Sequence, residues 1–327
     1  EMKEVFCITH FFNPVRYMRL LELVIGPQND KEKINDLVNF GDKILGKTVV
    51  VCNDSPGFLG NRVGVYAMQV AMTEAFNLGL TVEEADAVFG RPLGIPKTGI
   101  FGLYDLIGID LMADVLKSFI KELPISDPFH IVGKELPIIN QLIEDGYTGR
   151  KGKGGFFRMN KSSDVKILES LNYKNNTYHE SKKVDLGLPD VMDVVNVIER
   201  DDVYGKYAWS IIKKTILYAS SLVPDVTTNF NDIDDAMKCG FNWSKGPFEI
   251  LDEIGIENFV SKLNQDEEIP SFIKQLIDQK NSLFKTTDSA LEYFHPQHFY
   301  IPMKRPDGVI SLSDIKKCSK PIYTNAS

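Results

Sequence analysis

The chain has 327 residues, enough for roughly two domains, and 43% of them are hydrophobic, so it can bury sizeable cores. Its 25% of charged residues is ordinary for a globular protein, which excludes a disordered tail, a collagen-like fibre and a small disulfide-stapled fold. With 37 Lys and Arg against 45 Asp and Glu, the net charge is −8 and no basic face is evident. We therefore expect no nucleic-acid partner.

The cysteines and the hydropathy pattern bear on where the protein works. The four cysteines, Cys7, Cys52, Cys239 and Cys318, lie far apart and form no C-x-x-C pair. Such spacing indicates buried, reduced thiols in a cytoplasmic protein rather than disulfides or a zinc site. No apolar run approaches the roughly 18 residues that span a bilayer, so we expect no membrane span. The charged start does not read as a signal peptide, and it leads almost directly into a strand, so we expect a piece of something longer.

The first fifty residues have the pattern of an α/β sheet. Apolar, β-rich runs predict strands over residues 4–12, 20–25 and 48–52, and helical spacing predicts a helix over 30–46. The third run is nearly all apolar, as expected for a strand that is covered on both faces. We therefore expect part of an open sheet.

Helical patterns follow, in two blocks. The first comprises expected helices over residues 58–78, 81–89, 103–121 and 131–145, with a capping signature at Thr81. A basic, glycine-rich turn over 149–157 closes it, and the polar stretch 158–190 is interpreted as a linker. A second helical block runs from 191 to about 283, and the proline-containing tail 284–327 is expected to hold loops with short extended pieces.

The two helical blocks are related in sequence. When residues 99–112 are aligned with 246–259, six of the fourteen positions are identical. An acidic and alanine-containing stretch precedes each segment, at 85–88 and at 234–237. This predicts a duplicated helical domain present as a tandem pair, since two copies are too few for a solenoid.

His10 and Glu22 are the first candidates for chemistry. His10 ends an apolar strand, and from its position alone it is more often a satisfied core histidine. If the strands at 5–10 and 20–25 are neighbours, however, Glu22 reaches one imidazole nitrogen and raises the basicity of the other, which is the arrangement of a general base.

Three ordered sequence blocks resemble the 3-hydroxyacyl-CoA dehydrogenase family. The first is His10-Phe-Phe-Asn-Pro followed by the Glu22-containing strand, the second is Asn53-Asp-Ser-Pro-Gly-Phe-Leu-Gly-Asn-Arg62, and the third is Gly149-Arg-Lys leading to Gly154-Gly-Phe-Phe157. The resemblance covers about residues 1–157. The second helical block is similar, less closely, to the tandem C-terminal domains of the multifunctional members.

The resemblance implies a fold that is mainly α with a partial α/β start. A remnant of a Rossmann-type sheet over 1–54 would precede two related all-helical domains, of the 6-phosphogluconate-dehydrogenase C-terminal-like type, at 55–157 and 191–327, joined by the linker 158–190. It also implies NAD-dependent oxidation of (S)-3-hydroxyacyl-CoA to 3-oxoacyl-CoA in fatty-acid β-oxidation, by a homodimer.

Residue roles carry over from the same resemblance. His10 would take the proton of the 3-hydroxyl and Glu22 would orient His10. Asn61 would bind substrate near the reacting carbon; without the motif it is a helix-start residue. Asn13 and Lys151 would contact NAD, although a Gly-Arg-Lys-Gly turn outside the family is more often a solvated loop.

The chain departs from the family at the cofactor platform. No G-x-G-x-x-G turn is present, and the family's active-site serine would fall before Glu1. We therefore expect a truncated or split enzyme whose missing N-terminal Rossmann half comes from another chain. The alternative is a non-catalytic fragment that serves as a dimerisation or scaffold module, since a cut sheet exposes an apolar edge.

The remaining signals are weaker. His295 and His298 lie three residues apart but lack a third ligand, so we expect no metal site. A set of basic residues supplies positive charge either for the phosphates of coenzyme A or for an ordinary surface: Arg16, Arg19, Arg150, Lys151 and Lys153.

Overall fold

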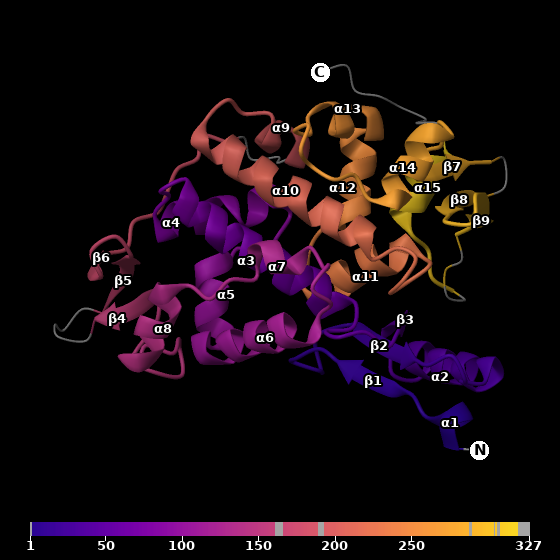
Figure 1. Cartoon of the computed structure of the whole chain (residues 1–327), viewed down its shortest axis with the longest axis horizontal. Coiled ribbons are helices and arrows are strands. Elements are labelled where there is room, and N and C mark those ends of the chain that lie inside the picture. The colour runs from indigo at the N-terminus through magenta and orange to yellow at the C-terminus, as the bar shows by residue number, and fades with distance from the viewer. Residues whose placement is uncertain are drawn as a thin grey trace.

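The computed structural model describes residues 2–160, 166–188, 193–287, 290–303, 305 and 308–319. A small sheet at the N-terminal end leads into two sets of helices that pack side by side (Figure 1). The expected class, mainly α with a partial α/β start, is confirmed.

The N-terminal sheet has three strands in the order β1-β2-β3. Its elements are α1 (Met2–Val5), β1 (Ile8–Phe11), β2 (Leu20–Ile25), α2 (Lys31–Lys43) and β3 (Thr48–Asn53). β2 runs antiparallel to β1 and parallel to β3. The strand expected over residues 4–12 is wrong at its start, because residues 2–5 form a helical turn and pairing with β2 begins only at Ile8.

The first helical block follows the sheet. It comprises α3 (Gly60–Asn77), α4 (Val82–Val88), the 3-10 turn η1 (Arg91–Leu93), α5 (Ile100–Ile107), α6 (Ile109–Glu122), α7 (Phe129–Val132) and α8 (Pro137–Glu144). The capping box of Thr81 with Glu84 is confirmed at the start of α4. The single helix expected over 103–121 is two helices, because Gly108 adopts φ +116° and ends α5.

The stretch 158–190 is not the structureless linker that its polar composition indicated. It contains an antiparallel sheet of β4 (Phe157–Asn160), β5 (Ile167–Asn172) and β6 (Thr177–Glu180). Ser170 and Leu171 are buried where this sheet meets the first helical block. The solvent face of this small sheet carries polar side chains. The polar composition of the segment therefore did not indicate that its other face is buried.

The second helical block repeats this plan. It comprises α9 (Val194–Ile198), α10 (Val203–Ser221), α11 (Phe230–Gly240), α12 (Pro247–Ile254), α13 (Ile256–Ser261) and α14 (Ser271–Asp278). The tail is more regular than expected, with β7 (Phe284–Thr286), β8 (Leu291–His295) and β9 (Phe299–Pro302) in an antiparallel sheet, followed by α15 (Leu312–Cys318). Each block thus ends in a three-stranded sheet.

A buried aspartate marks the repeat in both blocks. The carboxylate of Asp86 accepts the backbone N–H groups of Phe101 (2.7 Å) and Gly102 (3.0 Å) at the start of α5. Asp234 does the same for Phe248 (2.8 Å) and Glu249 (3.0 Å) at the start of α12. Asp86 is therefore the equivalent of Asp234, and both lie in the acidic stretches that precede the aligned segments.

The long helices of the two blocks, α3 and α10, lie against one another. Tyr66 and Tyr218 stack between them with ring centroids 3.9 Å apart, and the Tyr207 hydroxyl donates to the Ala71 carbonyl oxygen. The two blocks therefore share one continuous hydrophobic core.

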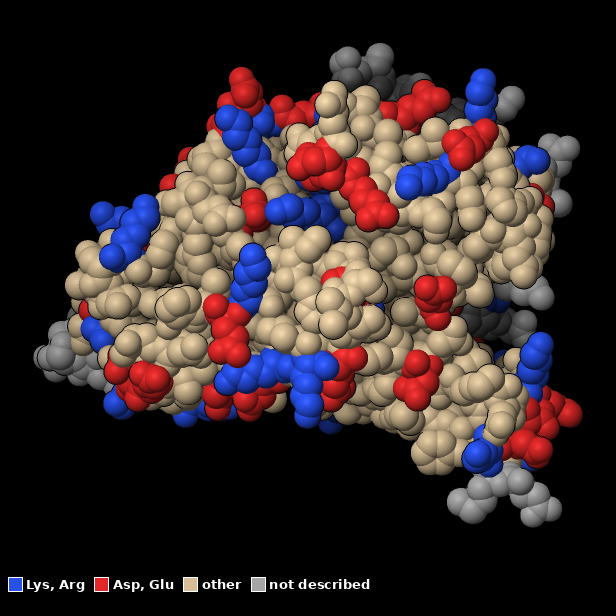
Figure 2. Space-filling model, viewed as in Figure 1, with Lys and Arg blue, Asp and Glu red and all other residues tan. Residues whose placement is uncertain are grey.

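Charge and thiols are spread over the molecule. On the face seen in Figure 2, Lys and Arg lie among Asp and Glu. All four cysteines are unpaired, but Cys52 alone is buried and Cys318 is exposed, which corrects the expectation of four buried thiols.

Within the described part of the chain, no helix is both long and apolar enough to cross a membrane. No group of three His, Cys, Asp or Glu side chains in those same ranges is arranged to hold a metal ion.

Candidate active site

His10 and Glu22 meet directly across the β1–β2 pair. The two residues are register partners in this antiparallel ladder, so their side chains leave the same face of the sheet. His10 Nδ1 lies 2.6 Å from Glu22 Oε2. The expected contact between strand neighbours is thus present.

Glu22 is held from its other side by the start of α3. Its Oε1 accepts the backbone N–H groups of Leu59 (3.0 Å) and Gly60 (2.6 Å), and its side chain has 0% exposure. The free N–H groups and the dipole at a helix N-terminus favour a negative charge there. Both carboxylate oxygens are therefore occupied, and the orientation of Glu22 is fixed.

Two residues at the start of α3 make this approach feasible. A Cβ at Gly60 would lie 2.8 Å from Phe12 Cζ and 3.4 Å from Glu22 Oε1, so a side chain there would push the helix away from the carboxylate. Phe58 adopts φ +52°, an uncommon conformation for a residue with a side chain. The turn before α3 is therefore shaped around Glu22.

Aromatic rings flank the imidazole of His10. Its ring centroid lies 4.8 Å from that of Phe12 and 5.4 Å from that of Phe58. The side chain is still 29% exposed, and among the described residues no hydrogen bond reaches Nε2. One nitrogen of His10 is thus fixed by Glu22 while the other remains available.

The other expected site residues lie at different distances from this pair. Asn61 follows Gly60 in the first turn of α3, half-buried and next to the amides that bind Glu22. Asn13 is exposed, two residues after β1 ends. Both lie close in the chain to groups of the site.

Lys151 is not near His10. Its Nζ lies 2.8 Å from Asp110 Oδ1 in the first turn of α6, whereas Phe119 near the other end of α6 packs against Gly57, which precedes Phe58. Nine residues of helix separate Asp110 from Phe119, which is about 13 Å along the axis. The structure therefore separates Lys151 from the His10–Glu22 pair.

The second helical block supports the site from behind, which the sequence did not indicate. The Phe241 ring lies 5.7 Å from that of Phe12, and Gly64 of α3 has no room for a Cβ because Phe241 fills that space. The Arg19 N–H also donates to the Cys239 carbonyl oxygen at 3.2 Å. No local pattern predicts such a contact, because more than two hundred residues separate its two sides.

The helix of the small sheet can be tested as a site for the phosphates of a dinucleotide. Pyrophosphate binds at an uncapped helix N-terminus that follows a glycine-rich turn. The helix of this sheet, α2, instead begins with the carboxylate of Asp30, which accepts the Glu32 N–H at 2.8 Å. A second anion is disfavoured there, so the start of α2 does not suit the phosphates of a dinucleotide.

Two family models match consecutive parts of the chain. Residues 1–55 match the 3-hydroxyacyl-CoA dehydrogenase NAD binding domain, and residues 57–159 match the C-terminal domain of the same family. The chain belongs to the 3-hydroxyacyl-CoA dehydrogenase family. Members of this family are NAD-dependent oxidoreductases, and the division between the two models falls just before α3.

Relatives carry the likeness into the second helical block. A Rickettsia prowazekii protein named as a fatty acid oxidation complex trifunctional enzyme is 42% identical over 258 residues, which is 79% of this chain and 35% of that protein. A Bacillus subtilis protein named as a 3-hydroxyacyl-CoA dehydrogenase is 30% identical over 100% of this chain and 42% of its own length. The chain thus spans well under half of these relatives.

A solved structure has the same fold as this family member. The 3-hydroxybutyryl-CoA dehydrogenase of Escherichia coli superposes with a TM-score of 0.60 at 19% identity, covering 84% of this chain and 71% of that one. At this identity the likeness shows the fold alone.

Proposed function

We propose that this chain carries the catalytic base of an NAD-dependent oxidation of (S)-3-hydroxyacyl-CoA to 3-oxoacyl-CoA in fatty-acid β-oxidation. The observation that carries the proposal is the His10–Glu22 pair, with Glu22 fixed by two amides and the second nitrogen of His10 available. The two matched family models supply the substrate class and the cofactor.

The chemistry assigned to the pair is proton transfer. NAD, when bound, accepts the hydride from C3 of the substrate. His10 Nδ1–H donates to Glu22, which leaves Nε2 as the lone-pair nitrogen that takes the proton of the 3-hydroxyl. The buried carboxylate then stabilises the imidazolium, and in the reverse direction the imidazolium returns the proton.

Asn61, Asn13 and Lys151 take supporting roles in this proposal. Asn61 lies beside the amides that hold Glu22, which suits a hydrogen bond to substrate near the reacting carbon. Asn13, exposed after β1, suits a contact with the nicotinamide. For Lys151, a contact with NAD requires its ion pair with Asp110 to open, so its assignment is the least supported of the three.

The cofactor platform is proposed to be completed by further strands. β1 pairs with β2 on one side only, and Phe6 and Ile8 near its free edge are 68% and 37% exposed. An unpaired edge with apolar neighbours is a template for strand addition. We propose that a segment or chain bearing the phosphate loop pairs there, and that the assembly is a homodimer.

The unpaired cysteines favour a reducing compartment, and we therefore propose that the enzyme acts in the cytoplasm.

Turnover tests the proposal. The chain, assembled with the proposed partner that bears the phosphate loop and supplied with acetoacetyl-CoA and NADH, is expected to oxidise NADH. His10→Gln is expected to lower this rate by about 10²-fold or more. His130→Gln is the matched control, because His130 lies in α7 and contacts the Leu123 carbonyl oxygen rather than Glu22. Undiminished turnover in His10→Gln would remove the proposed base.

A non-catalytic dimerisation or scaffold module is the second candidate. The free β1 edge favours it, since this edge can associate with a partner without any chemistry. A chain that associates through β1 yet shows no turnover after the strand-bearing partner is added would support this alternative.

A further inference from the structure

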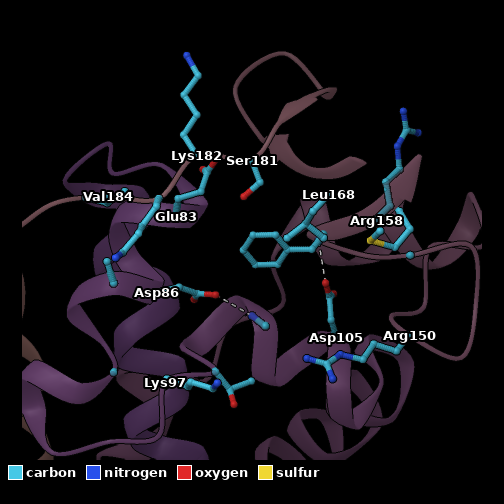
Figure 3. Close-up of a pocket in the computed structure, with 18 of the residues that line it drawn as sticks. Glu83, Asp86, Lys97, Asp105, Arg150, Arg158, Leu168, Ser181, Lys182 and Val184 are labelled. Atoms are coloured by element: carbon cyan, nitrogen blue, oxygen red, sulfur yellow. Dashed lines mark hydrogen bonds between the residues drawn. The ribbon is translucent and has the colours of Figure 1, made fainter. Parts of the chain in front are cut away.

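A cavity of about 920 Å³ lies in the first helical block, at a distance from His10. It opens to solvent and is bordered by α4, α5, the β4–β5 pair and the segment 181–184 that follows β6 (Figure 3). The mechanism proposed above uses none of its lining residues. Its volume is within the range of sites that hold a small organic ligand.

The rim of this cavity is positively charged. Five of its basic side chains are exposed and form no ion pair with any described residue: Arg91, Lys97, Arg150, Lys182 and Lys183. Three acidic side chains line the cavity, and each is engaged by other groups of the protein. Glu83 accepts the hydroxyl of Ser170 and lies 3.9 Å from His179 Nδ1. Asp86 accepts two N–H groups of α5, and Asp105 accepts those of Phe156 (2.9 Å) and Phe157 (2.7 Å). The field in the cavity therefore favours an anion.

One wall of the cavity is apolar. Met159 and Leu168 are register partners on β4 and β5, and they stay 44% and 45% exposed although both are large hydrophobic side chains. With Phe157, they form an apolar part of the lining, and Leu168 accepts a hydrogen bond from the backbone N–H of Ser181, the residue before Lys182. Such a combination suits a ligand with phosphates at one end and an aromatic base at the other.

The second helical block shows what closes an equivalent cavity. The corresponding space beside Asp234 is about 320 Å³. Gly90 and Lys238 correspond, because each lies four residues after its capping aspartate. Gly102 and Glu249 correspond in the alignment of residues 99–112 with 246–259, and each donates its backbone N–H to the capping aspartate. Lys238 Nζ and Glu249 Oε1 form an ion pair at 2.8 Å. Glycine at both positions leaves the first cavity open and its cations unpaired.

We propose that the first cavity binds a nucleotide: a diphosphate held by the five cations, with its base on the apolar wall of Phe157, Met159 and Leu168. The second cavity, filled by its own ion pairs, binds none. This site is separate from the His10–Glu22 pair, and the proposal does not rest on the proposed function.

Calorimetric titration of the full chain with ADP tests the proposal. Gly102→Glu transfers the closing side chain of the second block into the first. A Cβ at Gly102 would lie 3.3 Å from Asp86 Oδ2 and 3.5 Å from Thr98 Cγ2, so a small shift accommodates it. Glu at the third position of a helix also favours the fold. Lys182→Gln with Lys183→Gln removes charge without filling space, and Lys245→Gln, which disrupts an ion pair with Glu253 in the second block, is the control.

Saturable ADP binding is expected, weakened about tenfold or more by Gly102→Glu and by the double lysine variant, and unchanged by Lys245→Gln. Pyrophosphate and adenosine are each expected to bind more weakly than ADP. No ADP binding at millimolar concentration, or binding that neither variant changes, would overturn the proposal. If pyrophosphate bound as tightly as ADP, the proposed contact of the base with the apolar wall would be wrong.

Coenzyme A and NAD contain the same adenosine diphosphate group. Repeating the titration with each of them present identifies the source of the nucleotide. Displacement of ADP assigns the site to the nucleotide end of that molecule, and undisturbed ADP binding assigns it to a free nucleotide. Both results require the nucleotide site that the proposal describes.

Discussion

Glu22 is the residue on which the geometry of the candidate site depends. It lies between the imidazole of His10 and the first amides of α3, so one buried carboxylate links the sheet to the first helical block. A buried carboxylate persists when its oxygens are satisfied by strong donors, and here each oxygen has at least one. The orientation of His10 therefore depends on the fold of both parts.

Glu22→Gln is expected to lower kcat by about 10²-fold, because the amide stabilises the wrong tautomer and cannot support the imidazolium. KM is expected to change little, since Glu22 faces the protein interior and not the substrate. The measurement is steady-state turnover of the completed assembly with acetoacetyl-CoA and NADH. Glu32→Gln, on the exposed side of α2, is the control and is expected to behave as wild type. Equal losses in both variants would contradict a specific role for Glu22.

Gly60→Val is expected to lower both stability and turnover. Its side chain would meet Phe12 and crowd Glu22, so α3 must move away from the carboxylate. Overpacking of this kind costs about 1–3 kcal/mol in unfolding free energy. Chemical denaturation and turnover are the measurements, with Gly26→Ala as the control because it has open space around it. Full activity in Gly60→Val would show that the approach of α3 is not needed.

Capping aspartates organise the two helical blocks at the scale of the element. Asp86 and Asp234 each cap a helix that starts with glycine and continues with phenylalanine two positions on, and the glycine leaves no room for a Cβ beside the carboxylate. The glycine-rich block over residues 149–157 also surrounds a buried aspartate. Gly155 lets the chain turn over Asp105, whose oxygens accept the next two N–H groups. That block is therefore explained by structure without any ligand.

Asp86 predicts a pH dependence of stability. Burial raises its pKa from 3.8 to about 8, and the N–H groups of Phe101 and Gly102 only partly oppose the shift. In the folded state it thus keeps a proton that the unfolded chain has lost, so its contribution to stability is present at low pH and is lost as pH rises through about 8. Asp105, whose pKa burial raises to about 6, acts in the same direction at lower pH.

The unfolding free energy is therefore expected to fall between about pH 5 and pH 8. In Asp86→Asn this fall is expected to be smaller, because the amide does not titrate. Denaturant unfolding of both proteins at the two pH values is the measurement. An identical fall in the variant would show that Asp86 does not titrate in this range.

At the scale of elements, much could be predicted from the sequence. The strands at β2 and β3 and the helices α2, α3 and α4 follow their apolar periods and the Thr81 cap. The break at Gly108 was missed, because the apolar period continues across it and the positive φ is imposed by packing. The strand prediction wrongly included Val5 and Phe6. Their β-prone side chains have the same sequence pattern whether or not a neighbouring strand pairs with them.

The candidate site was partly predictable in the same way. The His10–Glu22 pairing follows from two short strands that are consecutive in the chain and pair with one another. The two amides at Leu59 and Gly60 could not be predicted, because they depend on how α3 docks against the sheet. Lys151 was grouped with the site through the family's motif, although its position at the far end of α6 depends on helix packing.

At the scale of the whole molecule, the second helical block is a structural partner of the active site. Phe241 packs against Phe12 and over Gly64, so the second copy of the repeat buttresses the ring that contacts His10. The two copies also differ at the cavity beside the capping aspartate, which is open in the first and closed by ion pairs in the second. The second block thus supports the active site, whereas the first block contains the open cavity.

Phe241→Ala is expected to lower the unfolding free energy by about 3 kcal/mol, as for other large-to-small changes at packed aromatic positions. Turnover is also expected to fall, since Phe12 loses its support. Denaturation and steady-state turnover are the measurements, and Phe40→Ala, at a ring 50% exposed on α2, is the control. A loss of stability with turnover per folded molecule unchanged would limit the role of the second block to folding.

The account depends most on His10 donating from Nδ1 to Glu22 and keeping Nε2 free. Nitrogen-15 NMR of the imidazole side chains at alkaline pH, where the ring is neutral, tests this arrangement in the chain itself. The chain has five histidines, and the spectrum of His10→Gln identifies the signal of His10 by its absence. We predict a protonated Nδ1 and an unprotonated Nε2, with the Nδ1 proton lost from the spectrum of Glu22→Gln. A proton on Nε2 in the wild-type chain would contradict the assignment of His10 as the base.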